Sequence, residues 1–419
     1  MEVIKIEGGH ALSGRVRIDS AKNSTVALIP AAILGEAPII LEQTPSIADV
    51  NQLCELIHQL NGTTQLTGDQ LMIDPSSLTN TPLTEGAVTK LRASYYFMGA
   101  LLGKFKEATV GLPGGCYLGP RPIDLHLKGF KALGATISQE GSIITLKAEE
   151  LVGTTIPLDF PSVGATINIM LAAVKAKGLT RIQNAAKEPE IVDVADLLIQ
   201  MGAKIDGAGT DEIRIEGVEA LQGATHTIIP DRIEAGTYIA LAAAAGTEVE
   251  VENIVPDHLE ALFDHLREMD VDFEIRPSSV LVRGKKAIRS TNLTTGTYPA
   301  LATDLQQPLA TLLTQASGSG CLTDTIYADR FKNCLELNKM GAQINVHQNS
   351  AQIQGPAMLK GTRVMATDLR AGASLVIAGL LADGVTEIGN TYHIDRGYSN
   401  LEKKLTALGA KIWRETIQE

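Results

Sequence analysis

The sequence repeats itself six times, and this repeat limits the possible folds more than any other feature. A motif of Leu or Met followed by Gly, Ala, any residue and Ile recurs at Leu133, Met201, Met340 and Leu408, with degenerate copies at Leu60 and Met269. Successive copies are 68 to 73 residues apart in the 419-residue chain. Six equivalent units of about seventy residues therefore account for the chain, and each unit has to pack against its neighbours.

Each unit shows the same order of expected elements. An amphipathic stretch such as residues 192–200, VDVADLLIQ, ends in the Gly of the motif, which is typical of a helix C-cap. Two short alternating strands follow, and a further extended stretch leads to a second helix of small and apolar residues, as in residues 163–173, VGATINIMLAA. Because this second helix is apolar on almost every side, we expect it to be buried.

The sixth unit stops after the motif, and the start of the chain supplies what it lacks. Residues 4–14 match residues 213–223 without a gap, so the first twenty or so residues provide the missing strands of the last unit. We therefore predict an α/β protein of two domains with three units each, one at 22–229 and the other at 1–21 plus 230–419. The chain crosses between them twice, which makes a hinge. The alternative is a solenoid scaffold that carries no chemistry.

Composition and charge exclude several classes of protein. Cys54, Cys116, Cys321 and Cys334 lie far apart and form no CxxC pair, which indicates a reduced, cytoplasmic protein without structural zinc. A net charge of −12 disfavours a nucleic-acid-binding protein. No stretch is long and apolar enough for a membrane span, and we see no signal peptide at the start of the sequence.

A polar residue opens each of the six apolar helices, at intervals of 66 to 72 residues. These residues are Lys22, Arg92, Ser162, Arg232, Asp304 and Arg370, flanked by Asn23, Asp231 and Asp368. A cation at a helix N-terminus interacts unfavourably with the helix dipole, which lowers the stability of the helix by about 0.3 to 1 kcal/mol. We interpret the arginines and the lysine as a basic cleft for a small ligand with several negative charges. Alternatively, they are solvated charges that pair with Asp231 or Asp368.

Cys116 lies among four glycines and three prolines in residues 111–122, GLPGGCYLGPRP. This composition predicts an exposed loop, and Arg121 would lower the pKa of a thiol nearby. The thiol is therefore either reactive or an incidental loop residue, whereas the other three cysteines lie in apolar contexts and are expected to be inert.

Four further residues are candidates for a role in a site, and three of them have two interpretations. Asp304 is either the N-cap of its helix or a general base. His126 and His393 are either acid–base groups or structural hydrogen-bonding residues near a site. Glu188 begins an acidic first turn, for which interaction with the helix dipole is a sufficient explanation.

Several segments together resemble the enolpyruvyl transferases, specifically those that act on UDP-N-acetylglucosamine in bacterial peptidoglycan precursor synthesis. The matching segments run along the whole chain and include LPGGCYLGPRPIDLH, PSVGATINIMLAA, NAAKEPEIVDVADLL, TDLQQPL, MATDLRAGASL and YHIDRGY. The resemblance implies two inside-out α/β barrels, each of three βαβαββ units with buried helices, that close over the substrate. It also implies transfer of the enolpyruvyl group of phosphoenolpyruvate to the sugar 3′-hydroxyl through a tetrahedral ketal.

The resemblance assigns roles residue by residue. Cys116 would protonate C-3 of phosphoenolpyruvate and form a covalent adduct, and Asp304 would be the base toward the sugar hydroxyl. Phosphoenolpyruvate would be held by Lys22, Arg121 and Arg396, with Arg370 and Asp368 nearby. The UDP-sugar would contact Asn23, Arg92, Arg121, Pro122, Ile123, Asp124, Leu125, Ser162, Val163, Gly164, Asp304 and Ile326, with Arg330 and Glu188 as supporting positions. No metal or organic cofactor is implied, and the only partners expected are the two small-molecule substrates.

The sequence departs from the family pattern in three places. Leu301-Ala302 replaces the usual Phe-Pro before Asp304, which would loosen the backbone that presents the base. Ala328-Asp329 replaces Glu-Asn before Arg330, and Phe160 stands where some members have Lys. Two alternatives thus stay open: a transferase that acts on shikimate 3-phosphate, against which the Cys116 loop argues, and a catalytically weak paralogue that senses a UDP-sugar.

Overall fold

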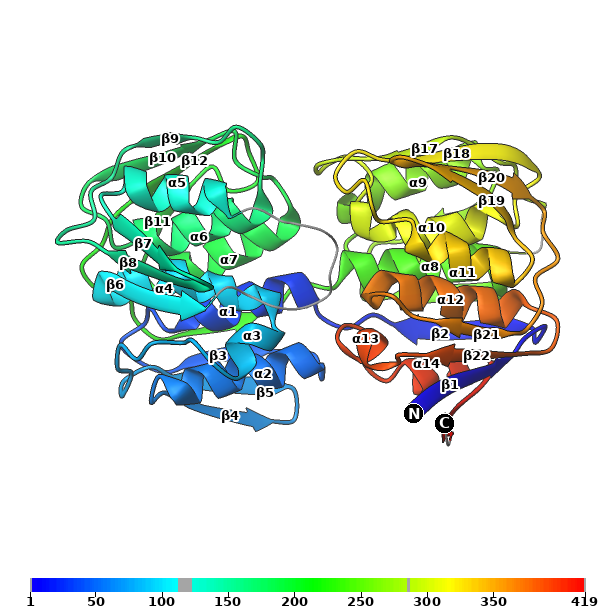
Figure 1. Ribbon diagram of the computed structural model, residues 1–419, viewed down its shortest axis with the longest axis horizontal. Coiled ribbons are helices and arrows are strands. Elements are labelled where there is room, and N and C mark those ends of the chain that lie inside the picture. Colours follow the sequence, from blue (N-terminus) through cyan, green and yellow to red (C-terminus); the bar gives the residue numbers. More distant parts are fainter. Residues whose placement is uncertain (1, 112–122, 285–286, 418–419) are drawn as a thin grey trace. The chain divides into compact units, whose positions relative to one another are not determined.

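The computed structural model describes residues 2–111, 123–284 and 287–417, which form two compact units (Figure 1). The contiguous unit holds the described residues from Ser20 to Ile229, and the composite unit combines those up to Asp19 with those from Pro230 onward. The division falls two residues before the expected domain start at Lys22. Ala21 belongs to the contiguous unit because its N–H donates to the Ile229 carbonyl at 2.7 Å.

Three sheets form the outside of the contiguous unit. In spatial order, the first consists of β13 (Ala224–Thr227), β3 (Ile39–Glu42), β5 (Gln70–Asp74) and β4 (Thr63–Thr67). The second consists of β6 (Glu107–Gly111), β8 (Ile143–Lys147) and β7 (Thr136–Glu140). The third consists of β11 (Lys204–Asp206), β12 (Glu212–Glu216), β10 (Leu179–Gln183) and β9 (Thr155–Pro157).

The composite unit also has three sheets. The first consists of β15 (Asp272–Ile275), β16 (Ser279–Arg283), β14 (Gly246–Glu252) and β2 (Leu12–Arg17). The second consists of β17 (Leu293–Thr295), β18 (Gly318–Asp324), β20 (Ser350–Gly355) and β19 (Gln343–His347). The third consists of β21 (Arg363–Met365), β22 (Val385–Gly389), β1 (Glu2–Glu7) and β23 (Lys411–Thr416).

Parallel edge strands connect the sheets of each unit into a closed ring. The extended stretch that ends one repeat pairs in parallel with the sheet of the next, as β9 does with β10 and β17 with β18. The last repeat returns to the first, through β13 with β3 and through β2 with β14. The start of the chain therefore supplies the missing strands of the last repeat, as predicted. β1 lies in the last sheet, and β2 is the connecting strand of that repeat, which pairs with β14.

Each repeat contributes one buried helix inside the ring (Figure 1). These helices are α1 (Lys22–Ala32), α4 (Tyr96–Phe105) and α6 (Val163–Ala173) in the contiguous unit, and α8 (Arg232–Ala245), α10 (Gln306–Leu313) and α12 (Leu369–Leu381) in the composite unit. Nearly all of their residues are buried, as the apolar sequences predict. Short turns of helix precede two of them: α3 (Ala87–Lys90) and η1 (Arg92–Tyr95) come before α4, and η3 (Thr303–Leu305) comes before α10. Two further short turns lie elsewhere, η2 (Pro256–Leu259) after β14 and α13 (Tyr392–Asp395) after β22.

The amphipathic helices end at the repeated motif. They are α2 (Ala48–Gln59), α5 (Asp124–Ala132), α7 (Pro189–Gln200), α9 (Glu260–Glu268), α11 (Lys332–Lys339) and α14 (Leu401–Ala407). After α5 and α7 the motif glycines Gly134 and Gly202 have φ of 103° and 107°, a left-handed conformation that glycine adopts without steric cost. The degenerate copies place Asn61 and Asp270 there, with φ of 62° and 60°. Asn and Asp tolerate this conformation better than other side chains, which explains why these copies diverge in sequence but keep the helix end.

Close approach of the buried helices depends on small residues, and Gly99 of α4 shows this clearly. Its N–H donates to Asn168 Oδ1 of α6 at 2.9 Å, and a Cβ added at Gly99 would lie 2.3 Å from the Asn168 carbonyl oxygen. Such a contact cannot be relieved by a side-chain rotation, because backbone lies on both sides. The two helices would have to move apart.

We expect Gly99→Ala to lower the free energy of unfolding by about 3 kcal/mol, although alanine is the better helix former. Urea unfolding followed by circular dichroism would measure the change. Gly68→Ala is the control: Gly68 has φ of 64° but no atom within 4 Å of an added Cβ, so only a backbone penalty of about 1 kcal/mol is expected. Equal effects at the two sites would contradict this account of the α4–α6 contact.

Among the described residues, no helix is long and apolar enough to cross a membrane.

Candidate active site

The structure places the six polar residues of the repeat pattern at the starts of the six buried helices, as predicted. In the contiguous unit, Lys22 is the first residue of α1, Arg92 opens the η1 turn that runs into α4, and Ser162 is the N-cap of α6. In the composite unit, Arg232 is the first residue of α8, Asp304 lies in the η3 turn before α10, and Arg370 is the second residue of α12.

Lys22 forms an ion pair that its local sequence does not reveal. Its Nζ lies 2.8 Å from Oδ2 of Asp49, a residue near the start of α2 whose side chain is completely buried. A buried carboxylate is costly unless a cation neutralises it, so Asp49 fixes the position of the Lys22 ammonium group. Asn23, the next residue, is half-buried.

His126 is a buried structural residue rather than an acid–base group. Its Nδ1 lies 2.9 Å from Asn168 Nδ2, and its ring packs edge-on against Tyr95, with 4.9 Å between the ring centroids. Burial and the positive charge of Arg92 lower the pKa of His126 to about 3, so the imidazole stays neutral at physiological pH. This outcome selects the structural interpretation of the two left open by the sequence.

The start of α6 presents Ser162, Val163 and Gly164 beside this histidine. Ser162 Oγ accepts from the N–H of Ala165 at 3.2 Å, which caps the helix. A Cβ at Gly164 would lie 2.9 Å from His126 Cε1, so only glycine lets the ring pack against the helix here. Nearby in sequence, Phe160 has an exposed side chain.

The remaining predicted residues of this unit lie at two more helix starts, or outside the described residues. Ile123 precedes α5, Asp124 is its first residue and Leu125 its second; Glu188 is the N-cap position of α7. Cys116, Arg121 and Pro122 lie outside the described residues.

In the composite unit, the Asp304 carboxylate lies between two buried guanidinium groups. Its Oδ1 is 2.7 Å from Arg330 Nη2, and its Oδ2 is 3.1 Å from Arg370 Nη2. The two arginine side chains are 4% and 3% exposed, whereas that of Asp304 is 25% exposed. Asp304 is thus a partly exposed carboxylate whose two oxygens are each held by a buried guanidinium group, so it can present an oxygen in a fixed direction to a bound hydroxyl.

Arg370 has a second partner besides Asp304. Its Nη1 donates to Tyr398 Oη at 3.1 Å, and its guanidinium group lies 5.5 Å from the centre of the Tyr398 ring. Burial lowers the pKa of Arg370, but Tyr398 and the carboxylates of Asp304 and Asp231 together raise it by more than burial lowers it. The pKa of Arg370 is therefore above its usual value. Arg370 is therefore not the solvated first-turn charge that the sequence allowed as an alternative.

Asp368 serves as the N-cap of α12. Its Oδ1 accepts from the N–H groups of Arg370 at 2.9 Å and Ala371 at 3.0 Å, and its Oδ2 accepts from Gln307 Nε2 at 3.1 Å. The charges of Asp368 and of Arg396, which follows α13, both act on half-buried His393. The pKa of His393 is lowered, mainly by burial. The positive charge of Arg396 lowers this pKa as well, whereas the negative charge of Asp368 raises it.

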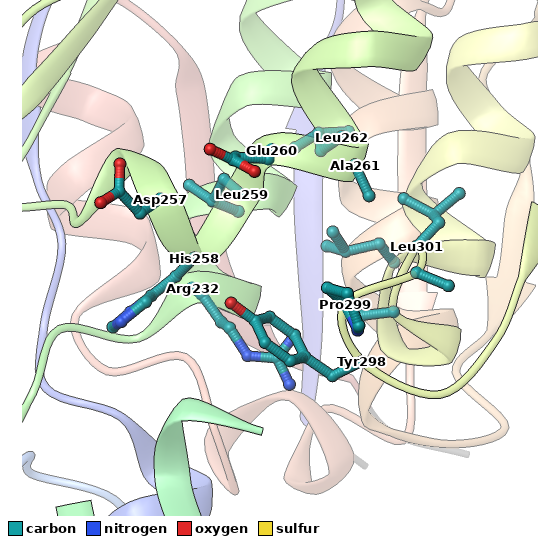
Figure 2. Close-up of a pocket in the computed structure, with 13 residues that line it drawn as sticks. Arg232, Asp257, His258, Leu259, Glu260, Ala261, Leu262, Tyr298, Pro299 and Leu301 are labelled. Atoms are coloured by element: carbon teal, nitrogen blue, oxygen red, sulfur yellow. The ribbon is translucent and has the colours of Figure 1, made fainter. Parts of the chain in front are cut away.

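The segment that leads to Asp304 borders a small pocket of about 40 Å³ (Figure 2). Tyr298 and Leu301 line it, and the Arg232 guanidinium lies 5.3 Å from the centre of the Tyr298 ring. The backbone around the Leu301-Ala302 departure is held at both residues. The Leu301 carbonyl accepts from Gly296 N–H and that of Ala302 from Leu305 N–H, each at 2.9 Å.

A second charged cluster lies at the start of α8. Glu234 is buried, and its carboxylate accepts from Lys404 Nζ at 2.6 Å and from the N–H of Asp19 at 2.7 Å. Lys404 also contacts the Asp19 carboxylate at 2.9 Å. Burial raises the pKa of Glu234 to about 7; Lys404 opposes this shift, whereas Asp19 and Asp231 add to it.

This shift predicts a pH dependence of stability. Between pH 4.5, the ordinary pKa, and about 7, folded Glu234 holds a proton that the unfolded chain has released. The contribution of Glu234 to the free energy of unfolding is complete below pH 4.5 and is lost as the pH rises through 7. The total loss is about 3 kcal/mol. We expect Glu234→Gln to remove this loss. Urea unfolding midpoints at pH 5 and pH 8 would show it, with exposed Glu149→Gln as the control that keeps the wild-type profile. Parallel profiles for wild type and Glu234→Gln would refute the assignment.

The family model of EPSP synthase (3-phosphoshikimate 1-carboxyvinyltransferase) matches residues 6–405. The chain is also 57% identical over 419 residues to a protein of Oceanobacillus iheyensis named UDP-N-acetylglucosamine 1-carboxyvinyltransferase 2, covering 100% of this chain and 98% of that one. The chain belongs to the enolpyruvyl transferase family. A protein of the same name from Listeria monocytogenes is 56% identical, covering 99% of this chain and 98% of its own.

Solved structures of enolpyruvyl transferases share the fold. NikO of Streptomyces tendae, described as an enolpyruvyl transferase, superposes with a TM-score of 0.91 at 26% identity, covering 100% of this chain and 99% of its own. EPSP synthase of Acinetobacter baumannii has a TM-score of 0.76 at 17% identity, covering 99% of this chain and 100% of its own. At this identity the similarity is evidence of a shared fold and not of a shared function. The prediction of two inside-out α/β barrels with three repeats each is confirmed.

In this enolpyruvyl transferase, the structure joins Asp304, Arg330 and Arg370 into one group and gives Lys22 a partner. Sequence reasoning missed three residues that hold these groups, namely Asp49, Tyr398 and Thr303. Each is distant in the sequence or has no charge, so spacing alone gives no signal for them. The sequence offered two hints: Thr303 directly precedes Asp304, and Tyr398 ends the matching segment YHIDRGY.

Proposed function

We propose that the chain transfers the enolpyruvyl group of phosphoenolpyruvate to the 3′-hydroxyl of UDP-N-acetylglucosamine and releases phosphate. The observation that carries this proposal is the Asp304 carboxylate, partly exposed between Arg330 and Arg370. Support also comes from relatives at 56–57% identity along the whole chain, whose names state this activity. The reaction would be the first committed step of peptidoglycan precursor synthesis, in the bacterial cytoplasm.

The chemistry needs a base, an acid and cations. Asp304 would remove the proton of the sugar hydroxyl as its oxygen bonds to C-2 of phosphoenolpyruvate, and Cys116 would add a proton to C-3, giving the tetrahedral ketal. Loss of phosphate together with a proton from C-3 then restores the double bond as an enol ether. Each proton transfer would account for about 10²- to 10⁴-fold in rate, and fixed cations would stabilise the phosphate and carboxylate charges.

The cations divide by role. Lys22, Arg121 and Arg396 would hold phosphoenolpyruvate, with Arg370 and Asp368 nearby. The UDP-sugar would contact Asn23, Arg92, Arg121, Pro122, Ile123, Asp124, Leu125, Ser162, Val163, Gly164, Asp304 and Ile326, with Arg330 and Glu188 as supporting positions. Asp49 would keep the Lys22 ammonium group in place through their ion pair.

One assay tests the proposal. Purified protein is given phosphoenolpyruvate with either UDP-N-acetylglucosamine or shikimate 3-phosphate, and phosphate release is measured. We expect phosphate release when UDP-N-acetylglucosamine is the acceptor and no release when shikimate 3-phosphate is the acceptor. Release with shikimate 3-phosphate would instead support the other acceptor, and binding of the UDP-sugar without release would support a sensor.

A further inference from the structure

A buried carboxylate outside the predicted site holds the groups around Asp304. Asp324 is the last residue of β18 and is 1% exposed. Its Oδ1 accepts from the N–H groups of Ile326 at 2.8 Å and Tyr327 at 3.0 Å, so it fixes the turn that follows the strand. Its Oδ2 accepts from the hydroxyl of Thr303 at 2.6 Å.

The Thr303 hydroxyl has a fixed direction, because an ionised carboxylate only accepts hydrogen bonds. Its single proton points to Asp324, and its lone pairs are left to accept from Arg330 Nη1 at 3.1 Å. Arg330 in turn places Nη2 on Asp304 Oδ1 at 2.7 Å. A continuous path of hydrogen bonds thus runs from Asp324 through Thr303 and Arg330 to the proposed base.

We propose that Asp324 is a positioning residue for the transfer reaction and that Thr303 is its relay. By holding Thr303 as an acceptor, Asp324 sets the orientation of the Arg330 guanidinium group and hence of the Asp304 carboxylate. Through its other oxygen it holds Ile326, a proposed contact of the acceptor sugar, in the same rigid turn. The inference rests on the proposed function, because it needs Asp304 to act on the acceptor hydroxyl.

The physical reason is the burial of Arg330. The Arg330 side chain is 4% exposed and its Nε has no hydrogen-bond partner in the described structure, so the contacts of Nη1 with Thr303 and of Nη2 with Asp304 fix the guanidinium group. Loss of the Thr303 acceptor removes one of these two contacts and lets the group turn. Rotation about the Arg330 side chain moves Nη2 away from Asp304. The Asp304 carboxylate then loses one of the two guanidinium contacts that orient it, and its alignment with the hydroxyl is less well fixed.

The test compares Thr303→Val with Thr303→Ser. Valine keeps the shape and removes the acceptor, and we expect kcat to fall about ten- to a hundredfold while KM for phosphoenolpyruvate stays within about twofold. Serine restores the hydroxyl and should restore kcat. Asp324→Asn should lower kcat in the same direction, and the double variant with Thr303→Val should be no slower than Thr303→Val alone. Thr314→Val is the control, since it removes a buried hydroxyl that, among the described residues, donates to the Thr311 carbonyl and accepts from Gln315 Nε2.

A second readout does not need turnover. Arginine-selective ¹⁵N NMR, assigned with Arg330→Lys, reports whether the Arg330 guanidinium group rotates freely. We expect hindered rotation in wild type and in Thr303→Ser, and free rotation in Thr303→Val. Unchanged rotation, or additive losses of kcat in the double variant, would overturn the inference. Absence of phosphate release by wild type with the UDP-sugar would instead overturn the proposed function, and the NMR result would still decide whether Asp324 and Thr303 orient Arg330.

Discussion

Asp304→Asn is expected to lower kcat for phosphate release by about 10³-fold with UDP-N-acetylglucosamine as acceptor. The asparagine side chain has the same shape and still offers one oxygen to a guanidinium group, but it cannot take a proton from the sugar hydroxyl. It also removes the negative charge between Arg330 and Arg370, both of which are buried. Steady-state kinetics of phosphate release would measure the loss.

The control for this variant separates lost chemistry from lost structure. Removal of one partner from a buried ionic group destabilises a protein, so the melting temperature of Asp304→Asn should be measured alongside kcat. Asp257→Asn, a change of the same kind at a residue that lines the pocket beside Tyr298, should leave kcat near the wild-type value. If Asp304→Asn is folded and retains more than about a tenth of wild-type kcat, Asp304 is not the base.

Cys116→Ala is expected to abolish both phosphate release and covalent labelling by the epoxide fosfomycin. Alanine has no proton to give to C-3 and no sulfur to attack an epoxide. Removal of the thiol group therefore explains both the loss of turnover and the loss of labelling. The prediction rests on the sequence around Cys116, which lies outside the described residues. Mass spectrometry of the intact protein would count the labels, and retained labelling in Cys116→Ala would refute the assignment.

The three other thiols provide the comparison. Burial raises the pKa of Cys334 to about 12 and also raises that of Cys54, so both remain protonated thiols and react poorly with an epoxide. Cys321 is half-buried, and its Sγ lies 3.8 Å from Thr323 Oγ1. Cys321→Ala is therefore the matched control, and it should keep both turnover and a single label.

The repeat predicted much of the fold because it encodes local structure. The apolar helices, their polar first residues and the helix ends at the motif all depend on short stretches of sequence. The position of β2 does not. The sequence of β2 is that of a strand of the last repeat, but β2 pairs with β14 of another sheet. This pairing forms when the ring of sheets closes. Strand pairing between distant segments leaves no local pattern to read.

The candidate site shows the same limit. Lys22, Asp304 and Arg370 could be found from spacing, because each opens a repeated helix. Their partners could not, since Asp49 and Tyr398 belong to other elements and are selected by packing alone. His126 illustrates the role of burial: its sequence context allowed an acid–base group, but the desolvated position beside Arg92 keeps it neutral.

The place of β1 has a consequence for how the protein is made. β1 is an interior strand, flanked by β22 and β23, yet a ribosome completes it about 380 residues before those partners. At translation rates of about 5 to 20 residues per second, this strand waits for roughly 20 to 80 seconds with both of its edges open. The contiguous unit is synthesised entirely within that interval. It can fold while β1 is still unpaired, so the open edges of β1 are a site for chaperone capture and aggregation in the nascent chain.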